Sequence, residues 1–480
     1  MAVKICDIVK DIEIISFDGD LNEQINEIAY DSRNVKEGDV FVCIKGYKTD
    51  GHKYAASAAE KGAKIIVAED KIDVCAKVMY VKDTRCALAL MAKAYFADPM
   101  KGKKLIGVTG TNGKTTVTYL VKKICRDHNM RLGLIGTNQN MIGDEIIPTE
   151  RTTPESFELY SLFDHMAKKG ADGVVMEVSS HALDLKRVYG CEFETAVFTN
   201  LTQDHLDFHG TMENYFNAKK KLFSMCKNAV INIDDEYGKR ILPSCKFLSY
   251  GIENEKASLN AKNIKISASG VNFDLVYENQ TYDAHLPIPG KFSVYNALAA
   301  IGAAISLKIS PQDAVDSLKT AHGVKGRCEV VKTNTPYTVI IDYAHTPDGL
   351  ENIISTINEF KENRVITLFG CGGDRDRTKR PIMGKTAGKL SDFLVVTSDN
   401  PRSEDPAKII DDIMPGVLES GCEYIRIENR REAIKWAMEN AKKGDIIILA
   451  GKGHETYQIL KDKTIHFDER EVIAEVLAGK

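Results

Sequence analysis

The residues from Lys104 to Thr116, KLIGVTGTNGKTT, decide the fold of this chain. The apolar run at their start predicts a buried strand, and a helical pattern follows the last glycine. A strand that enters a helix through a glycine-rich turn surrounds an anion with backbone N–H groups and a helix N-terminus. We therefore expect a phosphate-binding loop here, although Val108 stands where the usual pattern has its first glycine.

In this loop, Lys114 is placed to reach the β- and γ-phosphates of a nucleotide, and the hydroxyl of Thr115 is placed to ligate Mg²⁺. The alternative interpretation is a glycine-rich turn that binds no ligand. The sequence GKTT directly after a predicted strand favours the phosphate-binding interpretation.

Two polar motifs follow later strands of the same region. Glu177 lies near the end of the apolar run GVVMEV, where a carboxylate can supply the metal-binding group of a P-loop site. The segment TNLTQDHLDFHG at 199–210 gathers acids and histidines just past another strand. Mg²⁺ prefers oxygen ligands, so His205 would be a minority ligand. The alternatives are a solvated acid at a strand end and a structural histidine.

Outward from this region, short apolar runs alternate with helical patterns along the chain. Such alternation predicts an α/β protein with mostly parallel sheets that are covered on both faces. We place three domains at residues 1–100, 101–330 and 331–480. The first is a small α/β domain, the second has a P-loop ATPase-like parallel or mixed sheet, and the third is doubly wound and Rossmann-like.

Four polar loops follow the predicted strands of the third domain, within residues 342–455. In an open parallel sheet, ligands bind beyond the carboxyl ends of the strands, so these loops should meet at one edge. Together they carry cations and acids, namely Arg375, Arg402, Lys452, Asp399 and Glu455. That combination suits a zwitterionic ligand. Ordinary turn chemistry is the alternative for each loop alone.

The composition excludes several classes of protein. The 480 residues are 43% hydrophobic and 28% charged, with a net charge of −4, as in ordinary globular domains. This balance gives no basic footprint for nucleic acid and no polybasic membrane segment. We see no signal peptide and no spanning run, and the 11 cysteines form no C-x-x-C pair. We therefore expect a monomeric protein of a reducing cytoplasm.

Five motifs of the chain resemble, in order, those of the Mur ligases: GTNGKTT, EVSSHAL, TNLTQDHLDFHG, DYAHTPD and DNPRSEDP. These are ATP-dependent amide-forming enzymes of peptidoglycan synthesis, and the resemblance covers essentially all 480 residues. It implies one domain for the UDP end of the substrate, a central ATPase domain and a C-terminal domain for the incoming amino acid. The resemblance is strongest to the members that extend UDP-MurNAc-L-Ala-D-Glu.

The resemblance also implies a role for each matching residue. Those implied for ATP are Gly110, Thr111, Asn112, Gly113, Lys114, Thr115, Thr116, Asn296 at the adenine, Asp342 at the ribose, and Arg327 and His345 near the phosphates. Those implied for the UDP substrate are Ser32, Thr152, Thr153, Ser179 and Arg187. Those implied for catalysis are Lys114, Glu177, His205 and Lys219, with Thr115, Glu177, His205 and Lys219 holding Mg²⁺.

Lys219 matches the family's carbamylated lysine. An ordinary lysine, with a pKa of about 10.4, would repel Mg²⁺, whereas a carbamate offers two carboxylate-like oxygens. From the residues alone, a solvated helix lysine beside Lys220 and Lys221 is the favoured alternative.

In this family, the sequence Asp-Asn-Pro-Arg marks the enzymes that add meso-diaminopimelate, and it is intact here. The matching residues are Arg375, Asp399, Asn400, Pro401, Arg402, Gly451 and Glu455. Diaminopimelate has a second carboxylate that lysine lacks, and an arginine fork can discriminate it. Two positions depart from the family pattern: Leu185 stands where many members have glutamine, and Arg151 where asparagine is common.

We therefore expect the γ-carboxylate of D-Glu to attack the γ-phosphate of ATP, and the amine of diaminopimelate to attack the resulting acyl phosphate. The C-terminal domain is expected to close on the central one. The alternatives are an L-lysine-adding or other Mur-type ligase, a folylpolyglutamate-like enzyme, and a nucleotide-binding regulator that makes no amide.

Overall fold

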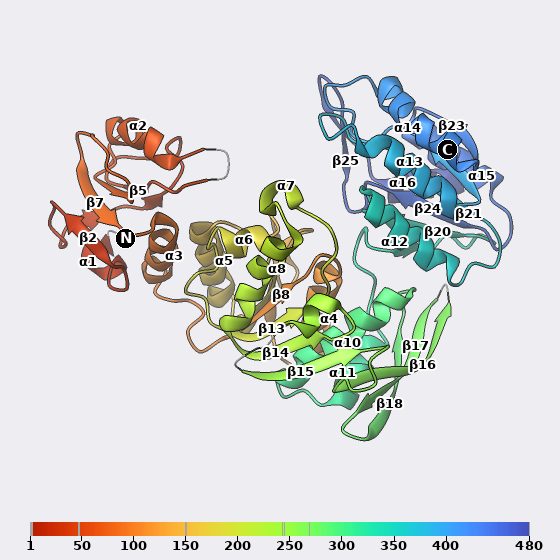
Figure 1. Ribbon diagram of the computed structural model, residues 1–480, viewed down its shortest axis with the longest axis horizontal. Helices are drawn as coiled ribbons and strands as arrows, with labels where there is room; N and C mark the ends of the chain where they lie inside the picture. Colours follow the sequence, from red (N-terminus) through yellow and green to blue (C-terminus); the bar gives the residue numbers. More distant parts are fainter. Residues whose placement is uncertain are drawn as a thin grey trace. The chain divides into compact units, whose positions relative to one another are not determined.

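The computed structural model describes residues 3–46, 49–148, 151–241, 243, 245–267 and 269–479. The chain divides into two compact units, Met1–Ser258 with Ala299–Ser310, and Leu259–Leu298 with Pro311–Lys480. Figure 1 shows the elements of each unit, coloured along the sequence.

The first unit begins with a small α/β layer. Its five-stranded sheet has the order β2-β7-β6-β5-β4, parallel from β4 to β7 and antiparallel at β2. Alternate residues of β5 and β6 enter two separate apolar clusters, so both faces of the sheet are covered. The elements are β1 (Val3–Lys4), α1 (Ile5–Ile8), β2 (Ile14–Phe17), β3 (Gln24–Ile25), β4 (Ile28–Ala29), β5 (Val40–Val42), η1 (Gly51–Tyr54), α2 (Ala55–Glu60), β6 (Ile65–Ala68), β7 (Lys77–Val81) and α3 (Thr84–Tyr95).

The same unit continues into a larger sheet whose strands β9-β12-β8-β13-β14-β15 are parallel, with β10 and β11 antiparallel beyond β9. Its strands are β8 (Lys104–Thr109), β9 (Leu132–Ile135), β10 (Asn140–Ile142), β11 (Glu145–Ile147), β12 (Gly173–Glu177), β13 (Phe193–Phe198), β14 (Cys226–Asn232) and β15 (Lys246–Gly251). Its helices are α4 (Lys114–Asp127), α5 (Ser156–Lys168), α6 (Ser180–Asp184), α7 (Leu206–His209), α8 (Met212–Lys220), η2 (Lys221–Ser224) and α9 (Glu236–Lys239).

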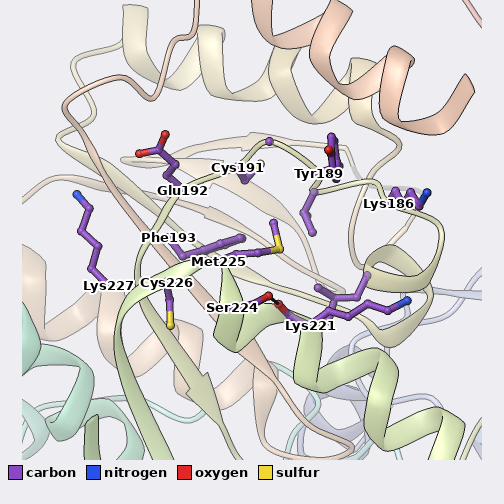
Figure 2. A pocket seen from close by; sticks show the side chains of 13 residues that line it. Lys186, Tyr189, Cys191, Glu192, Phe193, Lys221, Ser224, Met225, Cys226 and Lys227 are labelled. Carbon is purple, nitrogen blue, oxygen red and sulfur yellow. Dashed lines mark hydrogen bonds between the residues drawn. The ribbon is translucent and has the colours of Figure 1, made fainter. Parts of the chain in front are cut away.

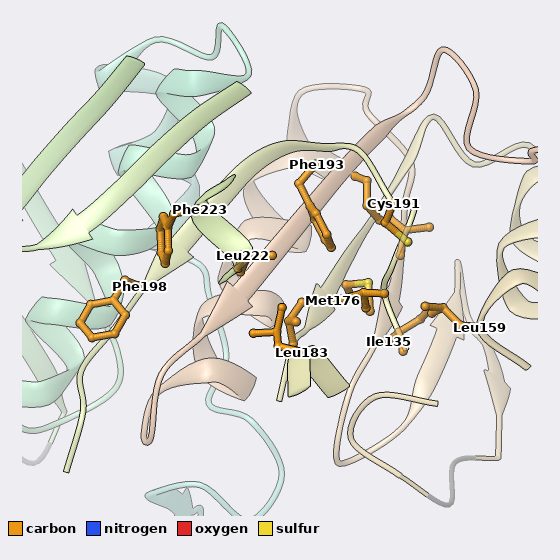
Figure 3. Close-up of a cluster of buried hydrophobic side chains, with 14 of the residues drawn as sticks. Ile135, Leu159, Met176, Leu183, Cys191, Phe193, Phe198, Leu222 and Phe223 are labelled. Carbon is orange, nitrogen blue, oxygen red and sulfur yellow. The ribbon is translucent and has the colours of Figure 1, made fainter. Parts of the chain in front are cut away.

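One face of this sheet is sealed by a large apolar cluster, shown in part in Figure 3. Leu159 of α5 packs with Met176 of β12, and Leu222 and Phe223 after α8 belong to the same cluster. Because β8 lies between β12 and β13, the loop after β8 opens at the carboxyl edge of the sheet between the loops that follow its two neighbours. This strand order brings the loops after β12, β8 and β13 together at the candidate site.

The second unit contains an antiparallel meander and a six-stranded sheet. The meander consists of β16 (Leu259–Ser267), β17 (Gly270–Tyr277) and β18 (Gln280–Leu286), and sequence analysis did not predict these strands. The helices α10 (Lys291–Ser306) and α11 (Pro311–Leu318) follow, and α10 runs from this unit into the first.

The six-stranded sheet has the order β19-β20-β24-β21-β22-β23 and is parallel except at β19. Helices α12, α13 and α14 cover one face and α15 and α16 the other, because neighbouring residues of β24 such as Ile447 and Ile448 enter opposite clusters. The elements are β19 (Glu329–Val331), β20 (Thr338–Asp342), α12 (Pro347–Asn358), β21 (Val365–Phe369), α13 (Lys379–Leu390), β22 (Phe393–Val396), α14 (Pro406–Ser420), β23 (Glu423–Arg426), α15 (Arg430–Asn440), β24 (Ile446–Ala450), β25 (Tyr457–Ile459), β26 (Thr464–His466) and α16 (Glu469–Leu477).

These sheets confirm the predicted α/β class, the parallel-rich central sheet and the doubly wound C-terminal sheet. Within the described residues, every helix is too short or too polar to cross a bilayer.

Candidate active site

The glycine-rich loop joins β8 to α4. Gly110 has φ 146° and Gly113 has φ 85°, both in the region that favours glycine. A Cβ on Gly110 would lie 1.9 Å from Thr199 Oγ1, so the loop packs closely against the segment after β13. The backbone N–H of Val117 donates to the carbonyl of Gly113 at 2.9 Å, which leaves the backbone amides of Thr115 and Thr116 without acceptors inside the helix. Such amides bind phosphate oxygens.

The side chain of Lys114 curls over its own loop. Its Nζ donates to the carbonyl oxygens of Gly110 and Thr111, at 3.0 and 2.8 Å. The ammonium group of Lys114 therefore lies at the loop that is expected to bind the phosphates.

The segment at residues 199–202, just after β13, clamps the glycine-rich loop, and we call it the clamp segment. The backbone N–H of Thr111 donates to the carbonyl of Asn200 at 2.8 Å, and that of Asn112 donates to Asn200 Oδ1 at 2.9 Å. Thr199 Oγ1 donates to the carbonyl of Asn112 at 2.6 Å. The clamp segment thus satisfies the backbone amides of Thr111 and Asn112, whereas those of Thr115 and Thr116 at the start of α4 can face a phosphate.

Glu177 lies at the end of β12, and its Cα is in register with Val108 of β8. The residue is 1% exposed, and its carboxylate accepts hydrogen bonds from the backbone N–H and the hydroxyl of Thr137 at 2.9 and 3.0 Å. The hydroxyl of Thr152 lies 3.0 Å from that of Thr137. With the buried hydroxyl residue Thr115 in the first turn of α4, this carboxylate provides the oxygen donors that Mg²⁺ prefers, so the residues present fit the ion.

Lys219 on α8 is buried, not solvated. It is 2% exposed, its Nζ donates to the carbonyl of Gly110 at 2.8 Å, and it lies 4.6 Å from the ring centroid of Tyr215. Burial, reinforced by the positive charge of Lys114, lowers the pKa of Lys219 well below its usual value. The interpretation of a solvated helix lysine is therefore wrong. A lowered pKa favours the neutral amine, the form that reacts with carbon dioxide.

Three histidines gather beside this lysine's helix. The ring of His181 lies 4.8 Å from that of His205 and 5.5 Å from that of His209, and His209 Nε2 is 2.9 Å from Ser180 Oγ. Burial, with the neighbouring histidines, lowers the pKa of His181 to about 4. Burial also lowers the pKa of His205, against the opposing effect of Asp204. Both rings are therefore neutral near pH 7, the form in which His205 can offer a nitrogen to a metal.

A cavity of about 720 Å³ lies in the first unit. Ser32 and Arg187, two predicted substrate contacts, line it, and so do Arg151 and Leu185, the two departures from the family pattern. Guanidinium groups in a cavity wall suit the phosphate and carboxylate groups of an anionic substrate. The other lining residues are Tyr30, Asp31, Arg33, Phe41, Ile44, Gly46, Thr49, Gly51, Tyr54, Arg85, Glu155, His181, Asp207 and Phe208.

Hydrogen bonds connect this cavity to the strand that carries Glu177. Arg187 Nη1 donates to the carbonyl of Thr153 at 3.1 Å, and Thr153 Oγ1 donates to the carbonyl of Glu177 at 2.9 Å. The backbone N–H of Ser179 donates to Thr153 Oγ1 at 3.0 Å. Hydrogen bonds thus connect three of the predicted substrate residues, Thr153, Ser179 and Arg187.

A second cavity of the same unit, of about 580 Å³, holds none of the predicted site residues (Figure 2). Apolar side chains such as Phe193 and Met225 line it. Two of its lysines are paired with acids, Lys221 with Asp184 at 2.9 Å and Lys227 with Glu194 at 3.3 Å. Its third lysine, Lys186, is paired with Asp83, so an acid balances each positive charge of the lining.

In the second unit, the loops after β22 and β24 meet at the carboxyl edge of the six-stranded sheet. Asn400 Nδ2 donates to Glu455 Oε2 at 2.8 Å, and the buried Nζ of Lys452 donates to both side chains, at 3.2 and 3.1 Å. Asp399 is 7% exposed, and its Oδ2 is buried without a hydrogen-bond partner in the described structure, 2.7 Å from where a Cβ on Gly451 would lie. An unpartnered buried carboxylate oxygen is suited to receive an ammonium group.

The other predicted acceptor residues lie in the neighbouring loops. Arg402 Nη1 donates to the carbonyl of Gly373 at 2.8 Å, which ties the loop after β22 to the loop after β21. Arg375 is exposed on the loop after β21, and Pro401 is buried beside Arg402. The predicted meeting of these loops at one edge is therefore observed.

Asp342 ends β20 and accepts two backbone amide hydrogen bonds, at 2.7 and 2.8 Å. Burial raises the pKa of its carboxyl, although Arg327 opposes the shift. The guanidinium of Arg327 lies 4.9 Å from the ring centroid of Tyr343, and His345 Nδ1 lies 2.8 Å from the carbonyl of Tyr343. Three predicted ATP contacts are thus neighbours, and Asn296 is 5% exposed on α10; the role of all four at ATP stays a prediction.

Sequence reasoning did not single out Asn200 or Thr137. Asn200 stands inside a motif that sequence analysis quoted, and an asparagine directly after a strand beside a phosphate loop is a usable signal. Thr137 carries no such signal, because its role depends on which strand lies next to β12.

The fold and this arrangement define an α/β protein with a loop of P-loop geometry, and comparisons with known proteins give its family. Three family models match: "Mur ligase family, catalytic domain" over residues 24–96, "Mur ligase middle domain" over 108–304 and "Mur ligase, glutamate ligase domain" over 326–453. The chain belongs to the Mur ligase family.

Full-length relatives agree with these models. A UDP-N-acetylmuramoyl-L-alanyl-D-glutamate--2,6-diaminopimelate ligase of Clostridium botulinum is 52% identical over 98% of both chains. A ligase of the same name from Clostridium acetobutylicum is 50% identical over 99% of both. A solved structure with that enzyme name is 32% identical, covers 100% of this chain and 99% of its own, and superposes with a TM-score of 0.74.

Proposed function

We propose that this protein is an ATP-dependent ligase that adds meso-diaminopimelate to the D-Glu of UDP-MurNAc-L-Ala-D-Glu, in the cytoplasmic synthesis of peptidoglycan precursors. The observation that carries the proposal is the similarity, over nearly the whole chain, to ligases whose names state these substrates. We further propose that it acts as a monomer, with domain boundaries near residues 100 and 330.

The geometry supports this proposal in each unit. In the first unit, the amides at the start of α4 and Lys114 suit the phosphates of ATP, and the arginine-lined cavity suits the UDP-linked dipeptide. In the second unit, the unpartnered oxygen of Asp399 suits the ammonium of an amino acid, and Arg402 suits a carboxylate.

The reaction has two steps. A carboxylate oxygen of D-Glu attacks the γ-phosphorus of ATP, the bond to the β-phosphate oxygen breaks, and ADP leaves behind an acyl phosphate. The neutral amine of diaminopimelate then attacks the acyl carbon, and phosphate leaves as the amide forms, with release of a proton. Lys114 and the helix amides offset the charge that develops on the transferred phosphoryl group.

Thr115, Glu177 and His205 would hold Mg²⁺, which neutralises phosphate charge when bound. We propose that Lys219 joins them as a carbamate, formed when its neutral amine adds carbon dioxide and loses a proton. The support is its burial and lowered pKa next to Gly110. A carbamate carbon signal after incubation with carbon-13-labelled bicarbonate would be expected, and its absence in native protein would contradict the assignment.

The test of the function is product formation. The protein is incubated with ATP, UDP-MurNAc-L-Ala-D-Glu and meso-diaminopimelate, and the UDP-linked tripeptide is sought by mass spectrometry. Formation of the tripeptide together with ADP and phosphate is expected. ATP hydrolysis without a new amide would favour the nucleotide-binding regulator instead.

A further inference from the structure

Two loops of the second unit are joined edge to edge. They follow β21 and β22, span residues 370–376 and 399–405, and carry Arg375 and Arg402 respectively. We call them the acceptor loops. The two arginines can contact the same ligand together only if the loops hold them at a fixed distance from each other.

Several hydrogen bonds join the acceptor loops. The backbone N–H of Gly373 donates to the carbonyl of Asn400 at 2.9 Å, and Arg402 Nη1 donates to the carbonyl of Gly373 at 2.8 Å. Ser403 Oγ donates to Asp374 Oδ1 at 2.6 Å. The position of Arg402 therefore depends on the position of the other loop.

A buried ion pair lies beneath this junction. Arg380 is 1% exposed and donates to both oxygens of Glu404, at 2.8 and 3.1 Å. Glu404 Oε1 also accepts from the backbone N–H of Asp374 at 2.6 Å, and Arg380 Nη2 reaches the carbonyl of Gly372 at 3.3 Å. Glu404 belongs to the second acceptor loop, so the pair is bonded to both loops at once.

The carboxylate form of Glu404 is stabilised by its neighbours. Its hydrogen bonds from Arg380 and from the backbone of Asp374 lower the pKa of the carboxyl to about 2. A bidentate guanidinium–carboxylate pair fixes orientation as well as distance, which a single hydrogen bond does not. This rigidity suits a site that must present two side chains to one ligand.

We propose that Arg380 and Glu404 are a positioning pair that holds the acceptor loops so that Arg375 and Arg402 select an amino acid with a second carboxylate. This inference rests on the proposed function and deepens it. Neither residue of the pair touches the ligand, and each acts through the loops.

The chain supplies a matched control for this proposal. Arg380 Nη1 also donates to Asp412 Oδ2 at 2.8 Å, so Asp412 pairs with the same guanidinium. Asp412 lies on α14, outside the acceptor loops, with a 43% exposed side chain. Removing its charge weakens the pairing of Arg380 without changing the hydrogen bond that the backbone N–H of Asp374 donates to Glu404.

The test compares Glu404→Gln with Asp412→Asn in the full-length protein. The measurements are KM for diaminopimelate, KM for ATP, kcat, the ratio of kcat/KM for diaminopimelate to that for L-lysine, and the melting temperature. Because Glu404→Gln removes the charge from these hydrogen bonds, we expect it to raise KM for diaminopimelate by about 10-fold or more. The diaminopimelate-to-lysine ratio should fall by a similar factor, while KM for ATP stays unchanged. Asp412→Asn should change each value by less than about threefold.

Equal effects of the two variants, or a Glu404→Gln effect seen only as a lower melting temperature, would overturn the proposal and make the pair purely structural. A change of KM for ATP as large as that for diaminopimelate would also overturn it. Failure of the unmutated protein to use diaminopimelate would instead refute the proposed function, and with it the ligand assigned to the loops.

Discussion

Replacing Asn200 with alanine should loosen the glycine-rich loop without replacing any residue that is expected to contact ATP. The substitution removes the Oδ1 that accepts from the backbone N–H of Asn112 at 2.9 Å, and the Nδ2 that donates to the carbonyl of Asn112 at 3.3 Å. The bond from the backbone N–H of Thr111 to the carbonyl of residue 200 remains, because it needs no side chain.

The size of the effect follows from these two hydrogen bonds. Each is worth roughly 0.5–1.5 kcal/mol, so the pair contributes about 1–3 kcal/mol to the order of the loop. If the loop must be reordered when ATP binds, this cost appears as weaker binding by a factor of about 5 to 150. KM for ATP should therefore rise by that factor, with KM for the UDP substrate unchanged.

Phosphate release at varied ATP, with both other substrates saturating, measures this change. Thr202→Val is the matched control, because its hydroxyl reaches Asn112 Nδ2 only at 3.5 Å and its backbone bond to Thr111 Oγ1 at 3.0 Å persists. We expect the control to stay within about threefold of the unmutated protein. If the Asn200→Ala protein has an unchanged KM for ATP, the claim that the clamp segment orders the glycine-rich loop for ATP is refuted.

Three further substitutions test other parts of the site. Gly110→Ala places a Cβ against Thr199 at φ 146°, a strain of about 1–3 kcal/mol, so both the melting temperature and ATP turnover should fall; a normal protein would contradict the loop geometry. Arg402→Ala should lower kcat/KM for diaminopimelate by roughly 10- to 150-fold and leave L-lysine unaffected, and equal losses with both amino acids would disprove its selectivity. Lys219→Met should fold normally yet lose ligase turnover, because the carbamate cannot form, and retained turnover would exclude that group. In the unmutated protein, activation by bicarbonate should disappear as the pH falls through the lowered pKa of Lys219, because the protonated amine cannot add carbon dioxide.

The parallel sheets were predictable because their strands are buried on both faces. Runs such as VITLF at β21 and IIILA at β24 are apolar at nearly every position and buried throughout, so they stand out in the sequence. The β16–β18 meander was not predicted, because its strands are partly exposed and interrupted by lysine, asparagine and aspartate. Such strands lack the strong periodicity on which sequence reasoning depends.

The site was predictable where residues follow a strand directly. Glu177 and Asp342 both end parallel strands, and the topology of such sheets places ligands at those ends. The clamp by Asn200 was not, because it depends on the pairing of β13 with β8, in which Phe198 is in register with Thr109. The burial of Lys219 was also missed, because its neighbours Lys220 and Lys221 suggested a solvated helix face.

The most direct test of the central claim is phosphate release from ATP in the presence of UDP-MurNAc-L-Ala-D-Glu, with meso-diaminopimelate, with L-lysine or with no amino acid. We predict release with diaminopimelate and little with lysine or without an acceptor, because the acceptor loops select a second carboxylate. Release with lysine in preference to diaminopimelate, or release that needs no amino acid, would contradict the account.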